Sequence, residues 1–539
     1  MPRRTAERFE GGDVVVTPDE NSRIIQPDRL AELLGVDATQ EQQRAVDTLI
    51  DEAILRYGPL AILKPDPDKG GSFVGALNEY SLAEIMKFPL QGHLVVDRSN
   101  GRFFAFDDRS GIFTQITKEE TGKKLSRIYA RLPELSKKLE PLSARPASVR
   151  GMKNLLEALA GTVGENYPFG GDPDQRPSVI HKPVANGLLS FDLESDESPA
   201  FRAGLFPSDR ALHRAPVIYD PAAGAVPERL INELLVPALG NKEMSGEFLD
   251  DFATAWLGGG LWPFCFILIG AADSGKSQLV EMLRLLHGQP HWVALSARNV
   301  GDKFGSSFLA GPVRVVSFTD AKGNALTGEV GELVKGLTGG DFKEDRGPHA
   351  QLLVAIKGDK IFLLTSNSCP KVDLDDDSAA WERRIRAYRF HSYPVEKRIA
   401  DFAQVLLRAE GSALLNRLIE GARRRIRLRL DGKRPAMLPQ MRELLDEILR
   451  RSCPIASFCE PRLTPERGHQ INRAELYSMF CDWLRERNGR PWNREDFNKR
   501  AAEVLKRAFG ASLSNSVEGG GKGWRGVRWL SHEEQADAD

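Results

Sequence analysis

The feature of this sequence that most constrains its fold is an apolar run that breaks abruptly into a glycine-containing loop. The apolar residues of 264–269 lead into Gly270, and 270–277 has the spacing G-x-x-x-x-G-K-S. An amphipathic segment follows at 278–286. A buried strand, a tight loop and a helix in this order predict an α/β domain built around the loop.

The loop itself has the chemistry of a phosphate site. Gly270 and Gly275 let the backbone curl so that successive N–H groups point at phosphate oxygens. The N-terminus of the following helix adds partial positive charge there. Lys276 is expected to reach the β- and γ-phosphates, and the Ser277 hydroxyl to ligate Mg²⁺. A chance glycine-rich turn is the alternative, but the flanking strand and helix favour an ATP and Mg²⁺ site formed by Gly270, Ala271, Ala272, Asp273, Ser274, Gly275, Lys276 and Ser277.

Length and composition limit what surrounds this loop. A chain of 539 residues is too long for one hydrophobic core, so several domains are expected. The net charge of −1 means that any nucleic-acid contact must come from local basic patches. The five cysteines are scattered without zinc-site spacing, which indicates buried thiols in a reducing compartment. No signal core or bilayer-spanning run is present, so we expect a cytoplasmic protein without a membrane partner.

Residues 290–391 alternate apolar runs with polar loops, which suits a mainly parallel sheet with helices on both faces. The runs are Trp292–Leu295, Val313–Phe318, Leu352–Ile356, Ile361–Thr365 and Ile385–Phe390.

Two of these runs end in polar residues suited to ATP hydrolysis. Asp320 follows the second run, and an acid at the tip of a strand beside the phosphate loop can hold Mg²⁺ directly or through water. Asn367 follows the fourth run and can orient the attacking water or touch the γ-phosphate. Either residue could instead simply form a turn, so both roles depend on the phosphate loop.

Arginine is the third ingredient of such a site. Arg383 and Arg384 precede the last apolar run, and an arginine at the γ-phosphate stabilises charge that develops during phosphoryl transfer. In a ring ATPase that arginine comes from the adjacent subunit. The alternative is a solvated basic helix or strand start.

The order of these motifs resembles that of superfamily 3 helicases, most closely the phage and plasmid replication group related to the poxvirus primase-helicase. The motifs are G-A-A-D-S-G-K-S, V-R-V-V-S-F-T-D, L-V-K-G-L-T-G-G-D-F-K-E-D-R, I-F-L-L-T-S-N-S-C-P and W-E-R-R-I-R. The most specific part is 335–341, and 184–191 with 217–221 resembles the domain that precedes the ATPase in that group. The resemblance extends from Gly92 to Phe390.

The resemblance implies an AAA+-like P-loop ATPase core in a hexameric ring that translocates on single-stranded or forked DNA. Such a helicase would replicate a phage, plasmid or integrated mobile element in a bacterial cytosol, with other replication proteins as further partners. Lys276, Ser277, Asp320, Asn367 and a finger at Arg383 or Arg384 would form a composite site. Two departures stand out: the family usually has glutamate at the Asp320 position, and no polymerase-like domain is recognisable before Gly92.

The aspartate keeps a second hypothesis open, namely a nucleotide-gated assembly or origin-binding ATPase that unwinds little. A signalling or defence ATPase with a borrowed helicase core is a third.

DNA contacts are expected on a β-hairpin at 341–360, which in such rings projects into the channel. Basic residues there would track phosphates without reading bases. The candidates are Lys343, Arg346, His349, Lys357 and Lys360, with Lys335 just before the hairpin. The basic run 423–430 is open to two interpretations, a DNA contact or a solvated helix face.

Five regions result from these patterns. They are an N-terminal arm and helical segment at 1–90, a mixed α+β domain at 91–244, the ATPase core at 245–395, a helical extension at 396–440 and a winged helix-turn-helix domain at 441–539. The last assignment is based on three helices followed by a glycine-tipped basic hairpin. Its second helix, 493–507, would offer several basic side chains to phosphate.

Overall fold

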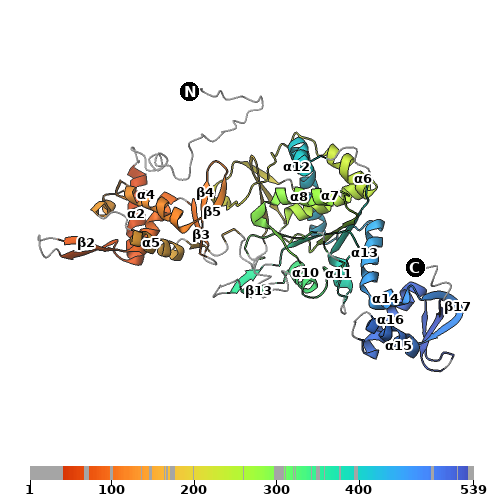
Figure 1. Cartoon of the computed structure of the whole chain (residues 1–539). Helices are drawn as coiled ribbons and strands as arrows, with labels where there is room; N and C mark the ends of the chain where they lie inside the picture. Colours follow the sequence, from red (N-terminus) through yellow and green to blue (C-terminus); the bar gives the residue numbers. More distant parts are fainter. Residues whose placement is uncertain are drawn as a thin grey trace.

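The computed structural model describes residues 40–531, apart from 66–71, 91, 98–100, 135, 145–148, 163, 166–167, 170–176, 198, 259, 297–308, 310, 320, 322, 342, 347–352, 357, 375–377, 394–398, 487–490 and 519. Three units follow one another along an elongated molecule, with a parallel-sheet unit in the middle (Figure 1). Among the described residues, no helix has the length and apolar character needed to cross a membrane.

The N-terminal unit packs four helices against a small sheet. One hydrophobic cluster joins residues from Val46 to Leu159, so the segment predicted as a separate 1–90 region shares a core with the helices and strands after it. The sheet has the order β5-β4-β3-β6, and its first three strands form the meander predicted at 93–116. The elements are α2 Gln40–Tyr57, β1 Ala61–Pro65, β2 Ser72–Leu77, α3 Glu79–Leu90, β3 Leu94–Asp97, β4 Arg102–Asp107, β5 Ile112–Ile116, α4 Lys118–Arg131, the 3₁₀ turns Leu132–Glu134 and Lys137–Ala144, α5 Val149–Thr162 and β6 Gly164–Glu165.

The segment 179–257, which follows the N-terminal sheet and precedes the first strand of the central sheet, packs with the middle unit rather than with the N-terminal one. Ile180, Leu189 and Phe191 share a hydrophobic cluster with helices that cover the central sheet, although the predicted boundary at 244 places them in the preceding domain. The elements here are β7 Val179–Val184, β8 Gly187–Asp192, β9 Ala200–Ala203, a 3₁₀ turn Pro207–Asp209, a π-helical turn Leu230–Leu235, α6 Val236–Leu239 and α7 Lys242–Leu257.

The central sheet has five parallel strands in the order β11-β12-β15-β10-β16, which confirms the prediction of a parallel sheet. Its elements are β10 Cys265–Gly270, α8 Lys276–His287, a 3₁₀ turn Gln289–His291, β11 Trp292–Ala294, β12 Val315–Phe318, α10 Glu329–Gly339, β15 Ile361–Ser366, α11 Ser378–Arg384 and β16 Ile385–Phe390.

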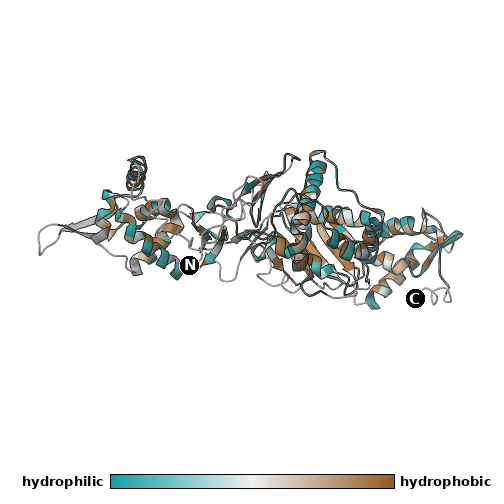
Figure 2. Ribbon diagram, turned by 90° about the horizontal axis from the view of Figure 1, so that it is seen from above, coloured by the Kyte–Doolittle hydropathy of each residue, from teal (hydrophilic) through white to brown (hydrophobic). Residues whose placement is uncertain are grey.

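Successive residues of these strands bury opposite faces of the sheet. In β10, Phe266 and Leu268 pack with α7, α8 and α12 (Phe402–Leu430), whereas Ile267 and Ile269 pack with α10, α11 and α13 (Pro439–Ser452). Helices therefore cover both faces, and hydrophobic residues concentrate in the strands between them (Figure 2). Burial on both faces explains why these strands read as continuous apolar runs.

One apolar run has a different position from the one expected. Residues 352–356 are predicted to join the parallel sheet, but β14 (Leu353–Ile356) pairs with β13 (Lys343–Arg346) as an antiparallel hairpin outside it. The hairpin predicted at 341–360 is thus confirmed for its two strands. Residues 358–360 lie between β14 and β15 rather than between β13 and β14, so they do not form the tip of the hairpin.

The C-terminal unit begins later than predicted. Helix α13 is expected to open it, but Leu444, Leu445 and Ile448 belong to the core of the central sheet. After it come α14 Pro454–Cys459, β17 Leu463–Asn472, α15 Arg473–Glu486, α16 Arg494–Phe509, β18 Ser512–Ser514 and β19 Gly523–Trp529, with sheet order β17-β19-β18. Trp524 is buried in the core of this unit. Two arginines of α16 face the central unit, since Arg500 donates to the Leu374 carbonyl and Arg507 pairs with Asp446.

Candidate nucleotide site and DNA contacts

The loop between β10 and α8 is shaped by two glycines at positions where a side chain would be strained. A Cβ on Gly270 would lie 2.1 Å from the Phe390 carbonyl oxygen of β16, which is far inside contact distance. Gly275 adopts φ 84°, a left-handed conformation that favours glycine. Asp273 also has a positive φ of 60°. The loop therefore folds back tightly at the carboxyl end of the sheet and starts α8 at Lys276.

The ammonium group of Lys276 lies over this loop. Its Nζ donates to the carbonyl oxygens of Gly270 at 2.6 Å and Ala271 at 2.7 Å, and to Ser274 Oγ at 3.0 Å. The side chain is 6% exposed. Three neutral oxygen acceptors from the loop thus hold a buried positive charge at its mouth. The ammonium group can exchange these neutral acceptors for charged phosphate oxygens, which bind it more strongly.

The loop fits the nucleotide and Mg²⁺ expected from the sequence. Residues 271–273 and Ser277 are exposed, so the loop backbone and the serine hydroxyl face solvent. Helix α8 contributes its N-terminal N–H groups and dipole at the same point. Asp320, the predicted second Mg²⁺ ligand, lies outside the described residues. Among those that are described, no cluster of three or more His, Cys, Asp or Glu side chains could hold a metal ion.

Asn367 lies beside the loop because β15 is the direct neighbour of β10. Ile269 is in register with Ser366, so Asn367 follows level with Gly270, and its side chain is exposed. Strand β12 lies one position further away, so the Asp320 segment is not on an adjacent strand as the sequence suggested. It is nevertheless tied to β15, since Ala321 donates to the Thr365 carbonyl at 2.8 Å and accepts from Ser366 Oγ at 2.9 Å.

The two candidate arginines lie at the opposite edge of the sheet from the loop. They end α11, and the next residue, Ile385, is in register with Cys265, the first residue of β10. The six residues of β10 separate that edge from Gly270, which is about 17 Å at 3.3 Å per residue. Arg384 donates from Nε to Thr338 Oγ1 at 3.0 Å and from Nη1 to the Ala380 carbonyl at 2.9 Å. Arg383 is the more exposed of the two.

The predicted DNA contacts divide into four groups. The backbones of Lys343 and Arg346 lie in β13, whereas His349 and Lys357 are outside the described residues. Lys335 lies on α10 with its Nζ 5.9 Å from the centre of the Trp381 ring. Lys360 differs from the expectation of a surface cation. It is 4% exposed and its Nζ pairs with Asp359 at 3.2 Å, so its ammonium group is not available on the surface for a DNA contact.

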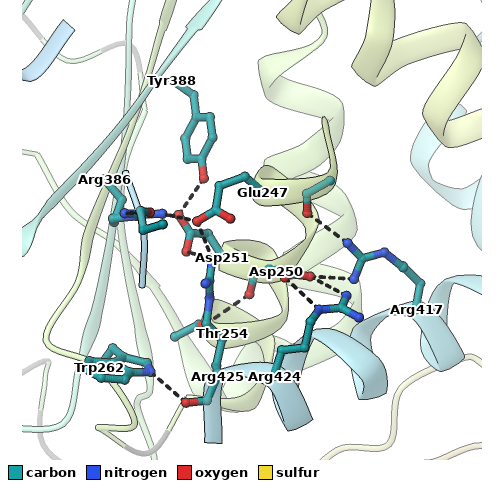
Figure 3. Close-up of polar contacts among 12 residues, drawn as sticks. Glu247, Asp250, Asp251, Thr254, Trp262, Arg386, Tyr388, Arg417, Arg424 and Arg425 are labelled. Atoms are coloured by element: carbon teal, nitrogen blue, oxygen red, sulfur yellow. Dashed lines mark hydrogen bonds and ion pairs between the residues drawn. The ribbon is translucent and has the colours of Figure 1, made fainter. Parts of the chain in front are cut away.

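The basic run 423–430 is only partly a solvated helix face, because Arg424 is 48% exposed but Arg425 is buried. Arg425 is buried on α12 and donates to Glu247 at 2.7 Å and Asp251 at 2.8 Å, while Arg424 pairs with Asp250 (Figure 3). Burial opposes ionisation of Asp250, but the hydrogen bonds and charges of its two arginine partners outweigh it and lower the carboxyl pKa. The run therefore fastens α12 to α7.

Sequence reasoning did not find the acidic side of this network. Glu247, Asp250 and Asp251 interrupt the otherwise apolar helix 245–257 at helical spacing i, i+3, i+4, which puts them on one face. That pattern was the available signal. Arg386, shortly after the predicted finger positions, joins the same network through Asp251 and Glu247.

Comparisons with known proteins add a distant structural likeness. No family model and no curated protein matches the chain. Among solved structures, the apo C-terminal region of NrS-1 (305–718) is similar with a TM-score of 0.40 and 12% identity, covering 81% of this chain and 96% of that chain. The A form of the same apo region gives a TM-score of 0.39 over the same coverage.

Proposed function

We propose that this protein is an ATP-dependent DNA helicase whose ATP sites are completed between subunits of a ring. The observation that carries the proposal is the loop at the end of β10, with the Lys276 ammonium held over it and Asn367 alongside. Bound ATP would supply the reactive phosphoanhydride bond, and Mg²⁺ would neutralise phosphate charge. Lys276 would hold the β- and γ-phosphates, Ser277 and Asp320 the metal ion, and Asn367 the attacking water.

The position of the arginines supports a shared site. Within one chain Arg383 and Arg384 lie a full strand length from the loop, too far to touch the same nucleotide. A second copy that docks its α11 edge against the carboxyl edge of the first would bring an arginine to the γ-phosphate. A closed ring repeats this head-to-tail contact around an axis.

The β13–β14 hairpin supports DNA as the substrate. It leaves the sheet as a separate two-stranded ribbon, with basic residues in β13 and in the sequence around its tip. In a ring such a ribbon would reach the central channel and contact the strand through phosphates, so binding would be independent of base sequence and weakened by salt.

Steady-state hydrolysis measured with and without single-stranded DNA tests the proposal. We expect DNA to stimulate hydrolysis, and Lys276→Ala to lower it about 100-fold or more, because it removes a charge that acts on the transition state. Arg408→Ala is the matched control, since Arg408 is an exposed cation of α12. A monomer whose hydrolysis ignores DNA would refute the helicase.

The assembly ATPase remains the second candidate because aspartate replaces the usual glutamate at 320. Strand displacement on a forked duplex separates the two, with Asp320→Glu and Asp320→Asn compared with the parent. A parent chain that forms rings with ATP but leaves the fork paired, with both variants equally inactive, would favour assembly.

A further inference from the structure

A cavity of about 500 Å³ lies at the amino-terminal edge of the central sheet, the edge opposite the nucleotide loop. Its walls include His291 just before β11, Arg314 just before β12 and Asp359 just before β15, together with Lys182 of β7. The volume is in the range of pockets that hold small molecules. None of these residues belongs to the nucleotide site proposed above.

Two cations in this cavity lack a counter-charge. Lys182 is 8% exposed, and its Nζ lies 5.4 Å from the centre of the Trp256 ring. Arg314 is half-buried, and neither cation has an ion-pair partner among the described residues. Burial lowers the pKa of Lys182 well below its usual value, and the charge of Arg314 lowers it further, so the two repel each other.

The acids in the wall do not neutralise them. Asp209 pairs with Arg202 and accepts from the Phe206 N–H at 2.8 Å. Asp359 pairs with Lys360. A third cation in the wall, Arg210, is in turn balanced by Glu165. These charges cancel locally, so the excess in the cavity is that of Lys182 and Arg314.

Helices α7 and α8 both end at this cavity and bring about half a negative charge each. Histidines cover their last carbonyls: His287 Nε2–H donates to the Ala255 oxygen at 2.9 Å, and His213 Nε2–H donates to the Leu285 oxygen at 3.0 Å. That leaves Nδ1 of His287, a residue only 2% exposed, buried without a partner among the described residues. His287 and Arg314 both lie next to Gly258, since a Cβ at that position would be 4.0 Å from His287 Cε1 and 4.0 Å from Arg314 Cδ.

Two unpaired cations and an unpaired imidazole nitrogen around one cavity are the groups that recognise a phosphate. The guanidinium fork of Arg314 can bind two phosphate oxygens at once, and Lys182 contributes a point charge. A phosphate anion would favour the charged form of Lys182 and the protonated form of His287, which then donates from Nδ1. We propose that this cavity binds a phosphate group, carried either by a nucleic-acid strand or by a small phosphate such as pyrophosphate.

The test uses the full chain carrying Lys276→Ala, which weakens phosphate binding at the nucleotide loop, and no arm measures hydrolysis. Its unfolding temperature is measured with sodium pyrophosphate, with oligothymidylate and with sodium chloride of equal ionic strength. We expect a phosphate source to raise the unfolding temperature above the chloride value. A rise with pyrophosphate alone that the cavity variants abolish identifies a small-anion site, and a rise with the oligonucleotide that they abolish identifies a strand site at the cavity rather than at the hairpin.

Lys182→Met and Arg314→Gln are then compared in the same background, with Arg408→Gln as the matched exposed-cation control. Without phosphate, both cavity variants are expected to unfold at a higher temperature than the parent, because each removes an uncompensated buried charge. With phosphate, they should bind about tenfold or more weakly by isothermal titration, and the control should match the parent.

Arg314→Lys keeps the fold and the charge but loses the fork, and should bind with intermediate affinity. The proposal is overturned if neither phosphate source stabilises the parent beyond chloride, or if the cavity variants bind phosphate as tightly as the control. Because the Lys276→Ala background is inactive by design, these outcomes are independent of whether the helicase proposal holds.

Discussion

Arg386 on β16 donates from Nε to Oδ2 of Asp251 on α7 at 2.6 Å, and both side chains are buried. The same carboxylate accepts from Tyr388 Oη at 2.5 Å and, through Oδ1, from Arg425 at 2.8 Å (Figure 3). Burial raises the pKa of Tyr388 well above its usual value, as does the adjacent carboxylate. One acid thus joins β16, the edge strand that directly follows the candidate finger arginines of α11, to two helices of the covering layer.

Asp251→Ala is expected to destabilise the central unit by about 3–5 kcal/mol, because it removes one of the two carboxylates that Arg386 and Arg425 share and leaves two buried positive charges on Glu247 alone. Its unfolding transition should fall by more than about 6 °C in calorimetry. Glu420→Ala removes an exposed acid of α12 and should shift the transition by less than about 2 °C. A similar shift for both variants would contradict a structural role for Asp251.

Gly270→Ala should distort the nucleotide loop, since the added Cβ has no room against the Phe390 carbonyl. Overpacking of this kind costs about 1–3 kcal/mol, and here the backbone that must move carries the phosphate-facing N–H groups. We expect loss of ATP binding by equilibrium titration together with a lower unfolding temperature. Gly246→Ala is the control, because a Cβ at this helical position meets nothing within 4 Å; it should leave ATP binding unchanged.

Mixed rings should reveal a site shared between subunits. Lys276→Ala removes the loop lysine, and alanine at the true finger, Arg383 or Arg384, is expected to lower hydrolysis about a thousandfold. When the two inactive variants are mixed, some interfaces pair an intact loop with an intact finger, so activity should return. The Lys276→Ala variant alone, at the same total protein concentration, gives the baseline rate of hydrolysis. No recovery with either arginine variant would argue for a site completed within one chain.

Acid should destabilise the protein through its buried histidines. Burial lowers the pKa of His291 to about 3, with a further contribution from the Arg314 charge, whereas the unfolded chain has a histidine pKa of about 6.5. The unfolded state therefore binds the extra proton first, so this stability is fully present above pH 6.5 and is lost as pH falls toward 3.

His291→Asn keeps a donor for the Pro312 carbonyl and removes the titration. Between pH 6.5 and 5.5 the free energy of unfolding of the parent should fall more steeply than that of the variant, by at most about 1.4 kcal/mol per pH unit. Denaturant titrations at several pH values measure both slopes, and equal slopes would contradict the assignment.

DNA affinity should depend on Lys343 of the hairpin but not on Lys360, which follows the hairpin in the sequence. Lys343→Ala is expected to weaken binding to oligothymidylate and to reduce the salt dependence by about one unit of slope, because one phosphate contact is lost. Lys360→Met should change neither, since its ammonium is buried against Asp359. Fluorescence anisotropy over a salt series measures both. A lower slope for Lys360→Met alone would reverse the assignment.

The sequence by itself determined the local units of the candidate nucleotide site. The strand, loop and helix around Lys276 follow from an apolar run, the spacing of Gly270 and Gly275, and an amphipathic segment, all of which act within a dozen or so residues. The parallel sheet was predictable for the same reason, because strands buried on both faces must be apolar throughout. The hairpin at 341–360 was expected from the family resemblance, and the structure forms its two strands at 343–346 and 353–356.

Only the tertiary structure decided which surfaces those units share. The amphipathic pattern of α13 indicates that one face is buried but not against which partner, so its assignment to the C-terminal unit is wrong. In the same way, Arg425 and Lys360 look like surface cations in the sequence. Arg425 pairs with Glu247, which comes from the distant helix α7. Lys360 pairs with its neighbour Asp359, but the burial of that pair is set by the surrounding fold. Charge pairing and burial are set by long-range packing. That packing pairs Arg424 and Arg425 of α12 with acids of α7 and places Lys182 and Arg314 around one cavity.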